Sequence, residues 1–183
     1  MTAHTHSIGK EVSSVIAQSW HRCSKFMQRE TWQAPHQAQG LTFESICRRK
    51  TALLTIAQAA LENAIHYAHQ RKQFGQKIAS FEMVQQMIAD MVTKTEAARA
   101  LVYKACWMQM TGDKKASLFS AMSKCFASDT AMEVTTTAVQ VMGGNGYSRE
   151  NPNEKYMRDA KIMQIYEGTN QVQSLVIANA AMY

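Results

Sequence analysis

Proline is rare in this chain of 183 residues and occurs only at Pro35 and Pro152. Because proline interrupts helices, the long stretch between them can form extended helices that end at glycines such as Gly75 and Gly112. No segment shows the sustained alternation of apolar and polar residues that predicts a half-buried strand. We therefore expect helices and no strands.

Long apolar runs are also missing from the sequence. None approaches the roughly 18 residues needed to span a bilayer, and the first residues lack the basic and apolar regions of a signal peptide. We therefore expect a cytoplasmic protein without membrane contact. The apolar fraction of 46% is still enough for a folded core.

The four cysteines are widely spaced and include no Cys-x-x-Cys pair. This spacing favours free or buried thiols over disulfides or a zinc site, and we expect no bound metal. His66 and His69 can share a helix face, but such a pair is a weak metal signal. The net charge of +6 lies mostly in the first 60 residues, and so small a basic excess is typical of a solvated surface. No nucleic-acid partner is expected.

Apolar residues recur at three- and four-residue steps along much of the chain, which predicts amphipathic helices. Ser80 and Ser117 are candidate N-caps, and Gly143 followed by Gly144 is a candidate helix end. Long helices joined by short turns predict an all-α fold, an up-down helical bundle. The expected helices cover residues 43–70, 81–110, 117–142 and 170–181, with a short helix after Pro152.

Residues 1–42, within the first 51 residues of the chain, differ from the rest in composition, because they hold four of the six histidines and two of the three tryptophans. We expect an N-terminal helical arm here, with a helix over about residues 9–29 that packs on the bundle through Trp20 and Trp32. The expected domains are this arm and a bundle of residues 52–183.

One segment near the end of the chain contains Tyr166-Glu167-Gly168-Thr169. A glutamate beside a glycine lies where the backbone can turn sharply and approach a ligand closely. Such a carboxylate can act as a base when it faces a dry pocket, where desolvation raises its pKa. Taken alone, a capping or surface glutamate explains this motif better.

The surrounding motifs change that interpretation, because they stand in a fixed order. In chain order they are Arg71-Lys72-Gln73-Phe74-Gly75, Ala127-Ser128-Asp129-Thr130-Ala131, Gln140, Gly143-Gly144-Asn145-Gly146-Tyr147 and Arg158-Asp159-Ala160-Lys161-Ile162. With these motifs, residues 52–183 resemble the C-terminal domain of acyl-CoA dehydrogenases. Several separate motifs at the family spacing make a chance resemblance an inadequate explanation.

The resemblance implies contacts with FAD at two places. Arg71 matches an arginine that pairs with the FAD diphosphate of a neighbouring subunit, and a guanidinium group suits two phosphate oxygens. Phe74 matches an aromatic residue near the adenosine. Gln140, Gly143 and Gly144 match a segment that contacts the same part of FAD. As alternatives, Arg71 can be an exposed cation at a helix end, and the glycines can form a tight turn.

The second place lies around the Tyr-Glu-Gly-Thr motif. Glu167 matches the catalytic base, and Glu167 with Gly168 matches the substrate-binding position at the thioester. Thr169 and Gln171 match positions that contact FAD in its own subunit. Arg158 and Asp159 are expected to form an ion pair that positions the Glu167 loop.

The resemblance implies an oxidoreductase, a flavoprotein of fatty acid metabolism that carries out FAD-dependent α,β-dehydrogenation of an acyl-CoA thioester. The implied partners are acyl-CoA, an electron-transfer flavoprotein and further copies of the chain in a homo-oligomer, a dimer or tetramer. Family members also have an N-terminal helical domain and a middle β domain, which residues 1–51 do not match, so we expect an incomplete form. Two alternatives are a non-catalytic oligomerisation module and a regulator-like protein that binds acyl-CoA or a partner.

A second resemblance covers about residues 12–51. Its signals are Ile16-Ala17-Gln18-Ser19-Trp20-His21-Arg22-Cys23, Pro35-His36, Leu41-Thr42 and Arg48-Arg49-Lys50. This region is similar to the N-terminal region of bacterial transcription activators of the acetoin-catabolism-regulator type. The sequence contains no helix-turn-helix or ATPase motif of such regulators, so their function is not expected here.

Overall fold

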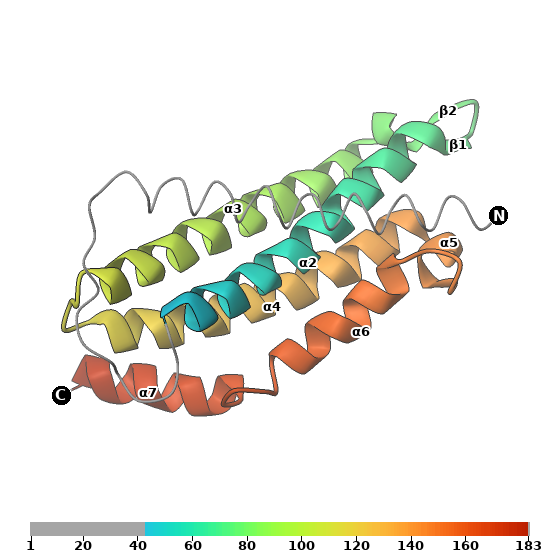
Figure 1. The fold of residues 1–183 in the computed structure, drawn as a ribbon. Coiled ribbons are helices and arrows are strands. Elements are labelled where there is room, and N and C mark those ends of the chain that lie inside the picture. The colour runs from blue at the N-terminus through green and yellow to red at the C-terminus, as the bar shows by residue number, and fades with distance from the viewer. Residues whose placement is uncertain (1–42, 183) are drawn as a thin grey trace.

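The computed structural model describes the backbone of residues 43–182 and the side chains of residues 51–182 (Figure 1). The helix expected over residues 9–29, with Trp20 and Trp32, lies outside the described residues. In chain order the elements are α2 (Phe43–Gln70), β1 (Lys72–Gln73), β2 (Gln76–Lys77), the 3₁₀ turn η1 (Ile78–Ser80), α3 (Glu82–Met110), α4 (Ala116–Met142), α5 (Gly144–Tyr147), α6 (Asn153–Met163) and α7 (Asn170–Met182).

The long helices α2, α3 and α4 run up and down the molecule and are joined by short connections (Figure 1). The expectation of an all-α, up-down bundle is confirmed. Helix α4 is the central element, because it contacts α2, α3, α6 and α7. The proposed boundary between an arm of residues 1–51 and the bundle lies within α2.

Small side chains let these helices approach closely. On α2 the buried alanines Ala57, Ala60, Ala64 and Ala68 recur at three- and four-residue steps, and they pack in one cluster with Val134 and its neighbours on α4. Buried hydroxyl groups on the helices are satisfied locally; the Thr135 hydroxyl, for example, donates to the Ala131 carbonyl at 2.7 Å. The alanines therefore let α2 and α4 pack closely against each other.

The expectation of no strands is wrong at one place, where β1 and β2 form a small antiparallel hairpin. Lys72 pairs with Lys77, and Gln73 pairs with Gln76. Phe74 and Gly75 form the turn with φ angles of 50° and 81°, as a two-residue hairpin turn requires. Two residues per strand are too few to produce an alternating pattern in the sequence.

The two predicted serine caps are also wrong. Ser80 belongs to η1, and α3 begins after Phe81 without a side-chain cap. Helix α4 begins at Ala116, ahead of Ser117, also without a side-chain cap. The start of α3 is instead fixed by η1, which buries Ile78 in the core. The predicted end of α4 at Gly143 is confirmed, because Gly143 adopts a φ of 59° there.

Asn153 at the start of α6 ties that helix to the bundle. Its side chain is fully buried; it accepts a hydrogen bond from Asn63 at 2.8 Å and contacts the sulfur of Met142 at 2.9 Å. Asn63 belongs to α2 and Met142 to α4, so three helices meet at one polar group. Within residues 43–182, no helix has both the length and the apolar character needed to cross a membrane.

Candidate active site

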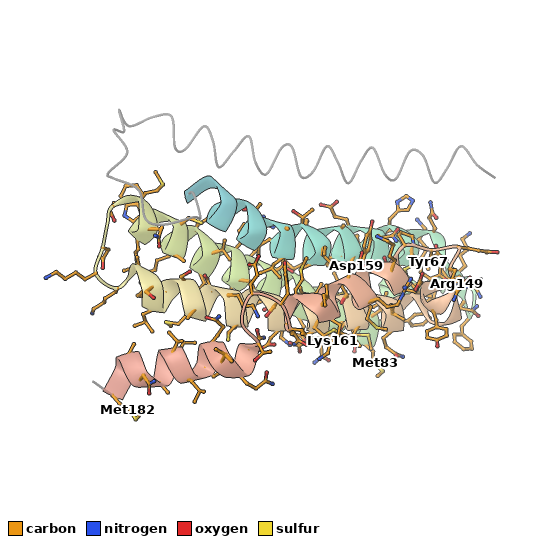
Figure 2. All side chains as sticks on the ribbon, turned by 60° about the horizontal axis from the view of Figure 1, so that its bottom comes forward. Tyr67, Met83, Arg149, Asp159, Lys161 and Met182 are labelled. Carbon is orange, nitrogen blue, oxygen red and sulfur yellow. The ribbon has the colours of Figure 1, made fainter. Side chains whose placement is uncertain are left out.

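The predicted site residues fall into two groups at different places on the bundle. Arg71 and Phe74 belong to the hairpin region, and Gln140, Gly143 and Gly144 lie at the α4–α5 junction. Both places are at one end of the bundle, which we call the hairpin end (Figure 1). At this end the Asn145 amide donates to the Tyr67 hydroxyl at 2.6 Å, which joins α5 to α2. Figure 2 shows Tyr67 and Arg149 at this end and Met182 at the opposite end.

The second group, Glu167 to Gln171, covers the end of the connection from α6 to α7, which we call the α6–α7 loop, and the first turn of α7. Asn170, the first residue of α7, contacts Ser128 of α4. Gln140 lies about three turns further along α4, which corresponds to a rise of roughly 18 Å. The structure therefore brings the predicted residues together as two separate groups.

Glu167 has an unusual backbone conformation within the α6–α7 loop. Its φ is 57°, and the φ of Gly168 is 86°. A residue other than glycine in this left-handed region costs on the order of 1–3 kcal/mol and persists only when its surroundings hold it. Its side chain is exposed at the surface of the described chain. The loop thus presents a carboxylate at a strained turn.

Lys124 of α4 holds this turn through two hydrogen bonds. Its ammonium group donates to the Gly168 carbonyl oxygen at 2.8 Å and to the Asn170 side-chain oxygen at 2.7 Å. Partial burial lowers the pKa of Lys124, while the charges of Asp129 and Glu167 act in the opposite direction. The sequence interpretation missed this residue, because a contact between positions so far apart leaves no local pattern.

Asn170 and Asp129 complete the support of the α6–α7 loop. The Asn170 amide nitrogen donates to the Asp129 carboxylate at 2.7 Å, and Gln164 donates to the same oxygen at 2.6 Å. The Gln173 amide donates to the Glu167 carbonyl oxygen at 3.3 Å. Asp129 belongs to a motif that carried the family resemblance, which was the one sequence signal that pointed to it.

The other residues of this group lie at the start of α7. The Thr169 hydroxyl oxygen accepts from the backbone N–H of Val172 at 3.3 Å, which caps the first turn of α7. Its hydrogen remains available for a ligand, because a hydroxyl group can donate and accept at once. Gln171 is exposed on the same turn.

The predicted ion pair between Arg158 and Asp159 is wrong. Arg158 pairs with Glu154 at 2.9 Å, and Asp159 pairs with Lys155 at 2.8 Å. Side chains four residues apart meet on a helix surface, whereas adjacent residues point in different directions. Both pairs therefore lie along α6, where Figure 2 shows Asp159.

At the hairpin end, Arg71 directly follows α2 and is exposed. Its backbone closes the hairpin, because Ile78 N–H donates to the Arg71 carbonyl oxygen at 2.9 Å. The side chain of Phe74 at the hairpin tip is 92% exposed and meets the ring of Phe81 edge-on at 6.2 Å between centroids. A cation and an exposed aromatic ring therefore project from one short turn.

The glycines beside Gln140 differ in what requires them. A Cβ on Gly146 would lie 2.8 Å from the Met142 Cβ, so packing within the chain requires that glycine. A Cβ on Gly144 would meet nothing within 4 Å, and its φ is not positive. An exposed glycine without an internal reason fits a surface where a bound group approaches the backbone.

Metal ligation finds no support in residues 51–182. That part of the chain contains no group of three histidine, cysteine or acidic side chains placed to hold a metal ion. His66 instead contacts the Gln70 amide at 2.8 Å on the surface of α2. Burial raises the pKa of the Cys125 thiol.

Comparison with known protein families identifies the family of this bundle. The family model for the acyl-CoA dehydrogenase C-terminal domain matches residues 39–182. The chain belongs to the acyl-CoA dehydrogenase family. The match begins somewhat before residue 52, where the sequence resemblance was placed, and it includes both groups of site residues.

Individual relatives agree with this assignment. The chain is 56% identical over 127 residues to the probable acyl-CoA dehydrogenase FadE25 of Mycobacterium tuberculosis, which covers 69% of this chain and 33% of that protein. It is 52% identical over 128 residues to the cyclohex-1-ene-1-carbonyl-CoA dehydrogenase of Geobacter metallireducens, covering 70% of this chain and 34% of that protein. The chain thus spans about a third of the length of these curated relatives.

Solved structures resemble the bundle in the same way. The butyryl-CoA dehydrogenase of Megasphaera elsdenii superposes with a TM-score of 0.73 at 45% identity, covering 77% of this chain and 37% of that one.

The resemblance to a bacterial regulator is also confirmed. The glycerol metabolism operon regulatory protein of Citrobacter freundii is 94% identical over 64 residues, which cover 35% of this chain and 10% of that protein.

Proposed function

We propose that this chain is an acyl-CoA dehydrogenase-like oxidoreductase that supplies the catalytic base and part of the flavin site for α,β-dehydrogenation of an acyl-CoA thioester. The observation that carries this proposal is the conformation of Glu167, a left-handed glutamate whose own carbonyl oxygen and that of Gly168 both accept side-chain hydrogen bonds. Strain of this kind concentrates at functional sites when the surrounding structure maintains it.

In the proposed reaction, the Glu167 carboxylate accepts the proton from the α-carbon of the acyl chain. The backbone N–H of Glu167 donates to the thioester carbonyl oxygen, which acidifies that proton by stabilising the negative charge that develops on the oxygen. Bound FAD would supply the acceptor for the hydride of the β-carbon. Gly168 carries no side chain, and the Gln173 amide occupies the space where a Cβ would lie.

The residues present fit FAD at both places. At the hairpin end, the Arg71 guanidinium would pair with the diphosphate, the Phe74 ring would pack on the adenosine, and Gln140, Gly143 and Gly144 would approach the same part. The open space around Gly144 supports this fit. In the α6–α7 loop, the Thr169 hydroxyl and the Gln171 amide would contact FAD.

The separation of the two groups supports an assembly in which each serves a different FAD. The hairpin end would complete the site of a neighbouring copy, while the α6–α7 loop would act at the site of its own copy. Helix α7 also supports an assembly. In the described part of the chain all of its side chains are at least partly exposed, and Leu175 is 65% exposed. Apolar surface of this kind favours association with another molecule.

An electron-transfer flavoprotein is the proposed electron acceptor.

One alternative function has specific support. The chain can serve as a non-catalytic oligomerisation module, because Val172, Leu175, Val176 and Met182 are exposed along α7. Such a module would assemble through α7 without binding flavin, and Glu167 would have no role. Flavin binding therefore distinguishes the two functions.

The test begins with the purified chain incubated with FAD and desalted. We expect retained visible flavin absorbance and conversion of acyl-CoA thioesters of several chain lengths to enoyl-CoA with an artificial electron acceptor. Glu167→Gln should retain flavin and lose conversion, while Glu62→Gln, an exposed glutamate on α2, should change neither. If the chain retains no flavin and forms no enoyl-CoA, the proposal fails, and association measured by light scattering would support the oligomerisation module.

A further inference from the structure

We propose that Lys124 is a positioning residue for Glu167: its ammonium group fixes the Gly168 carbonyl and the Asn170 side chain, and so holds the base in its reactive orientation. This inference rests on the proposed role of Glu167. The two contacts are short, at 2.8 Å and 2.7 Å, and both come from one nitrogen on the central helix α4. Hydrogen bonds from a charged donor are stronger than neutral ones.

The chemistry of the lysine side chain suits this position. An ammonium group has three donors and no acceptor, so it can hold two oxygen atoms of the loop at once. Partial burial removes part of the hydration of the ammonium group and thereby lowers the pKa of Lys124. The titratable groups that raise the pKa of Lys124 are Cys125 and Asp129 on α4 and Glu167 in the loop, and all three favour the ammonium form.

Asn170 is held from two sides by charges of opposite sign. Its side-chain oxygen accepts from Lys124, and its side-chain nitrogen donates to Asp129 at 2.7 Å. This arrangement allows only one orientation of the amide. Ser128 lies between Lys124 and Asp129 in the sequence. Its hydroxyl oxygen accepts from the Asn170 side-chain nitrogen at 2.8 Å, and its hydroxyl group donates to the Asn170 side-chain oxygen at 3.1 Å. One turn of α4 therefore fixes the residue where α7 begins.

The same turn of α4 also fixes the residue before the loop. Gln164 donates to Asp129 at 2.6 Å, and its carbonyl oxygen accepts from the Asn170 N–H at 3.1 Å. Lys124 and Asp129 thus hold the start, the middle and the end of the segment from Gln164 to Asn170. We call Lys124, Ser128, Asp129, Gln164 and Asn170 the loop network.

Glu167 needs this network because its left-handed conformation does not persist without support. The peptide group after Gly168 is held by Lys124, and the one after Glu167 is held by Gln173 at 3.3 Å. Loss of the lysine leaves the Gly168 carbonyl without this charged donor. The peptide plane can then rotate, and the Glu167 carboxylate changes direction with it.

The first test measures amide hydrogen exchange in the full chain. Lys124→Met should accelerate exchange in residues 164–170 by about tenfold or more, because an open loop exchanges faster than a closed one. Amides of α2 and α3 should exchange as in the wild type. Lys155→Met is the matched control, because it removes an exposed lysine of α6 that pairs with Asp159, and it should leave exchange in residues 164–170 unchanged.

Lys124→Arg keeps the charge and should restore most of the protection. If Lys124→Met lowers the protection of every helix, Lys124→Gln replaces it in the comparison, because the shorter amide still donates one hydrogen bond. Unchanged exchange in residues 164–170 in both neutral variants would overturn the proposal. Equal acceleration in all helices in both variants would also overturn it, because the lysine would then serve general stability.

The second test separates positioning from the proposed function. With flavin-loaded protein, Lys124→Met should lower kcat by roughly 10- to 100-fold while KM changes little, because misplacement of a base affects the chemical step. Lys124→Arg should recover part of kcat. If the wild type shows no dehydrogenation, the function proposed for Glu167 fails, while the exchange result still decides whether Lys124 holds the loop. If kcat is unchanged in an active protein, Lys124 does not position the base.

Discussion

The hairpin end and the α6–α7 loop use the same backbone arrangement in different settings. Each contains a residue other than glycine with positive φ followed by a glycine: Phe74 and Gly75 in the hairpin, Glu167 and Gly168 in the loop. The hairpin turn is closed locally by two short strands. The α6–α7 loop is held by side chains of α4, which lies far from it in the sequence.

This difference indicates different roles for the two turns. The Phe74 side chain is almost fully exposed, and nothing lies near Gly75 where a Cβ would stand. A Cβ on Gly168 would lie 2.6 Å from the Gln173 amide nitrogen. The hairpin therefore presents side chains outward on a locally formed turn, whereas the loop orients one carboxylate through contacts with α4 and α7.

The largest expected effect is on catalysis, and it separates the two turns most clearly. Glu167→Gln should lower dehydrogenation of acyl-CoA by about 10²- to 10⁴-fold, the range typical for loss of a general base. Phe74→Leu should leave kcat unchanged at saturating FAD, because its side chain is not in the loop. Steady-state assays of the flavin-loaded protein measure both. Equal loss of kcat in the two variants would contradict separate roles.

The next effect concerns flavin affinity at the hairpin end. Arg71→Met should weaken FAD binding by about 10- to 100-fold, since a charged hydrogen bond contributes on the order of 1.5–3 kcal/mol. Its neighbour Lys72→Met removes the same charge from an exposed strand residue and should change affinity little. Fluorescence titration with FAD gives both dissociation constants. Equal weakening would mean that total charge, and not Arg71, governs binding.

Glycine substitutions compare how the two turns are held. Gly75→Ala should cost about 1–2 kcal/mol, the strain of a left-handed alanine. Gly168→Ala should cost about 1 kcal/mol more, because the new methyl group displaces Gln173 and breaks its hydrogen bond to Glu167. Urea unfolding measures both free energies. A greater loss at Gly75 would contradict the tertiary support of the loop.

The smallest expected effect concerns the ion pair between Glu154 and Arg158. The Arg158 guanidinium lowers the pKa of Glu154. A carboxyl with a lowered folded pKa stabilises the protein above its unfolded pKa, and this contribution is lost as the pH falls through the folded pKa. Arg158→Gln should therefore cause a slight loss of stability near neutral pH that disappears in acid, without changing exchange in residues 164–170. Thermal unfolding across pH checks the first part, and altered exchange in the loop would revive the predicted role of Arg158.

Much of the fold could be predicted because its signals are local. The 3.6-residue period shows the long helices, and Gly143 marks the end of α4. The hairpin of residues 72–77 was not predicted, because strands of two residues leave no periodic pattern. Ser80 and Ser117 failed as caps because burial of Ile78 and the α3–α4 turn, rather than a serine hydroxyl, fix where those helices begin.

The site was predictable only in its motifs. Glu167 and Gly168 stand out as a possible turn in the sequence, and the family resemblance gave them a role. Lys124 and Asp129 gave no comparable signal for the loop, because their partners lie more than 30 residues away along the chain. Arg158 and Asp159 drew attention as adjacent opposite charges, yet helix geometry directs each to a residue four positions away.

The most direct test of the account mixes two variants, Glu167→Gln and Arg71→Met, at an FAD concentration that supports only the wild-type site. If the hairpin end serves a neighbouring copy, each mixed dimer regains one intact site, from Glu167 of one copy and Arg71 of the other. Random mixing should then give about a quarter of wild-type activity. Activity no greater than that of the separate variants, with an active wild type and confirmed subunit exchange, would contradict the account and place both groups at one FAD on a single chain.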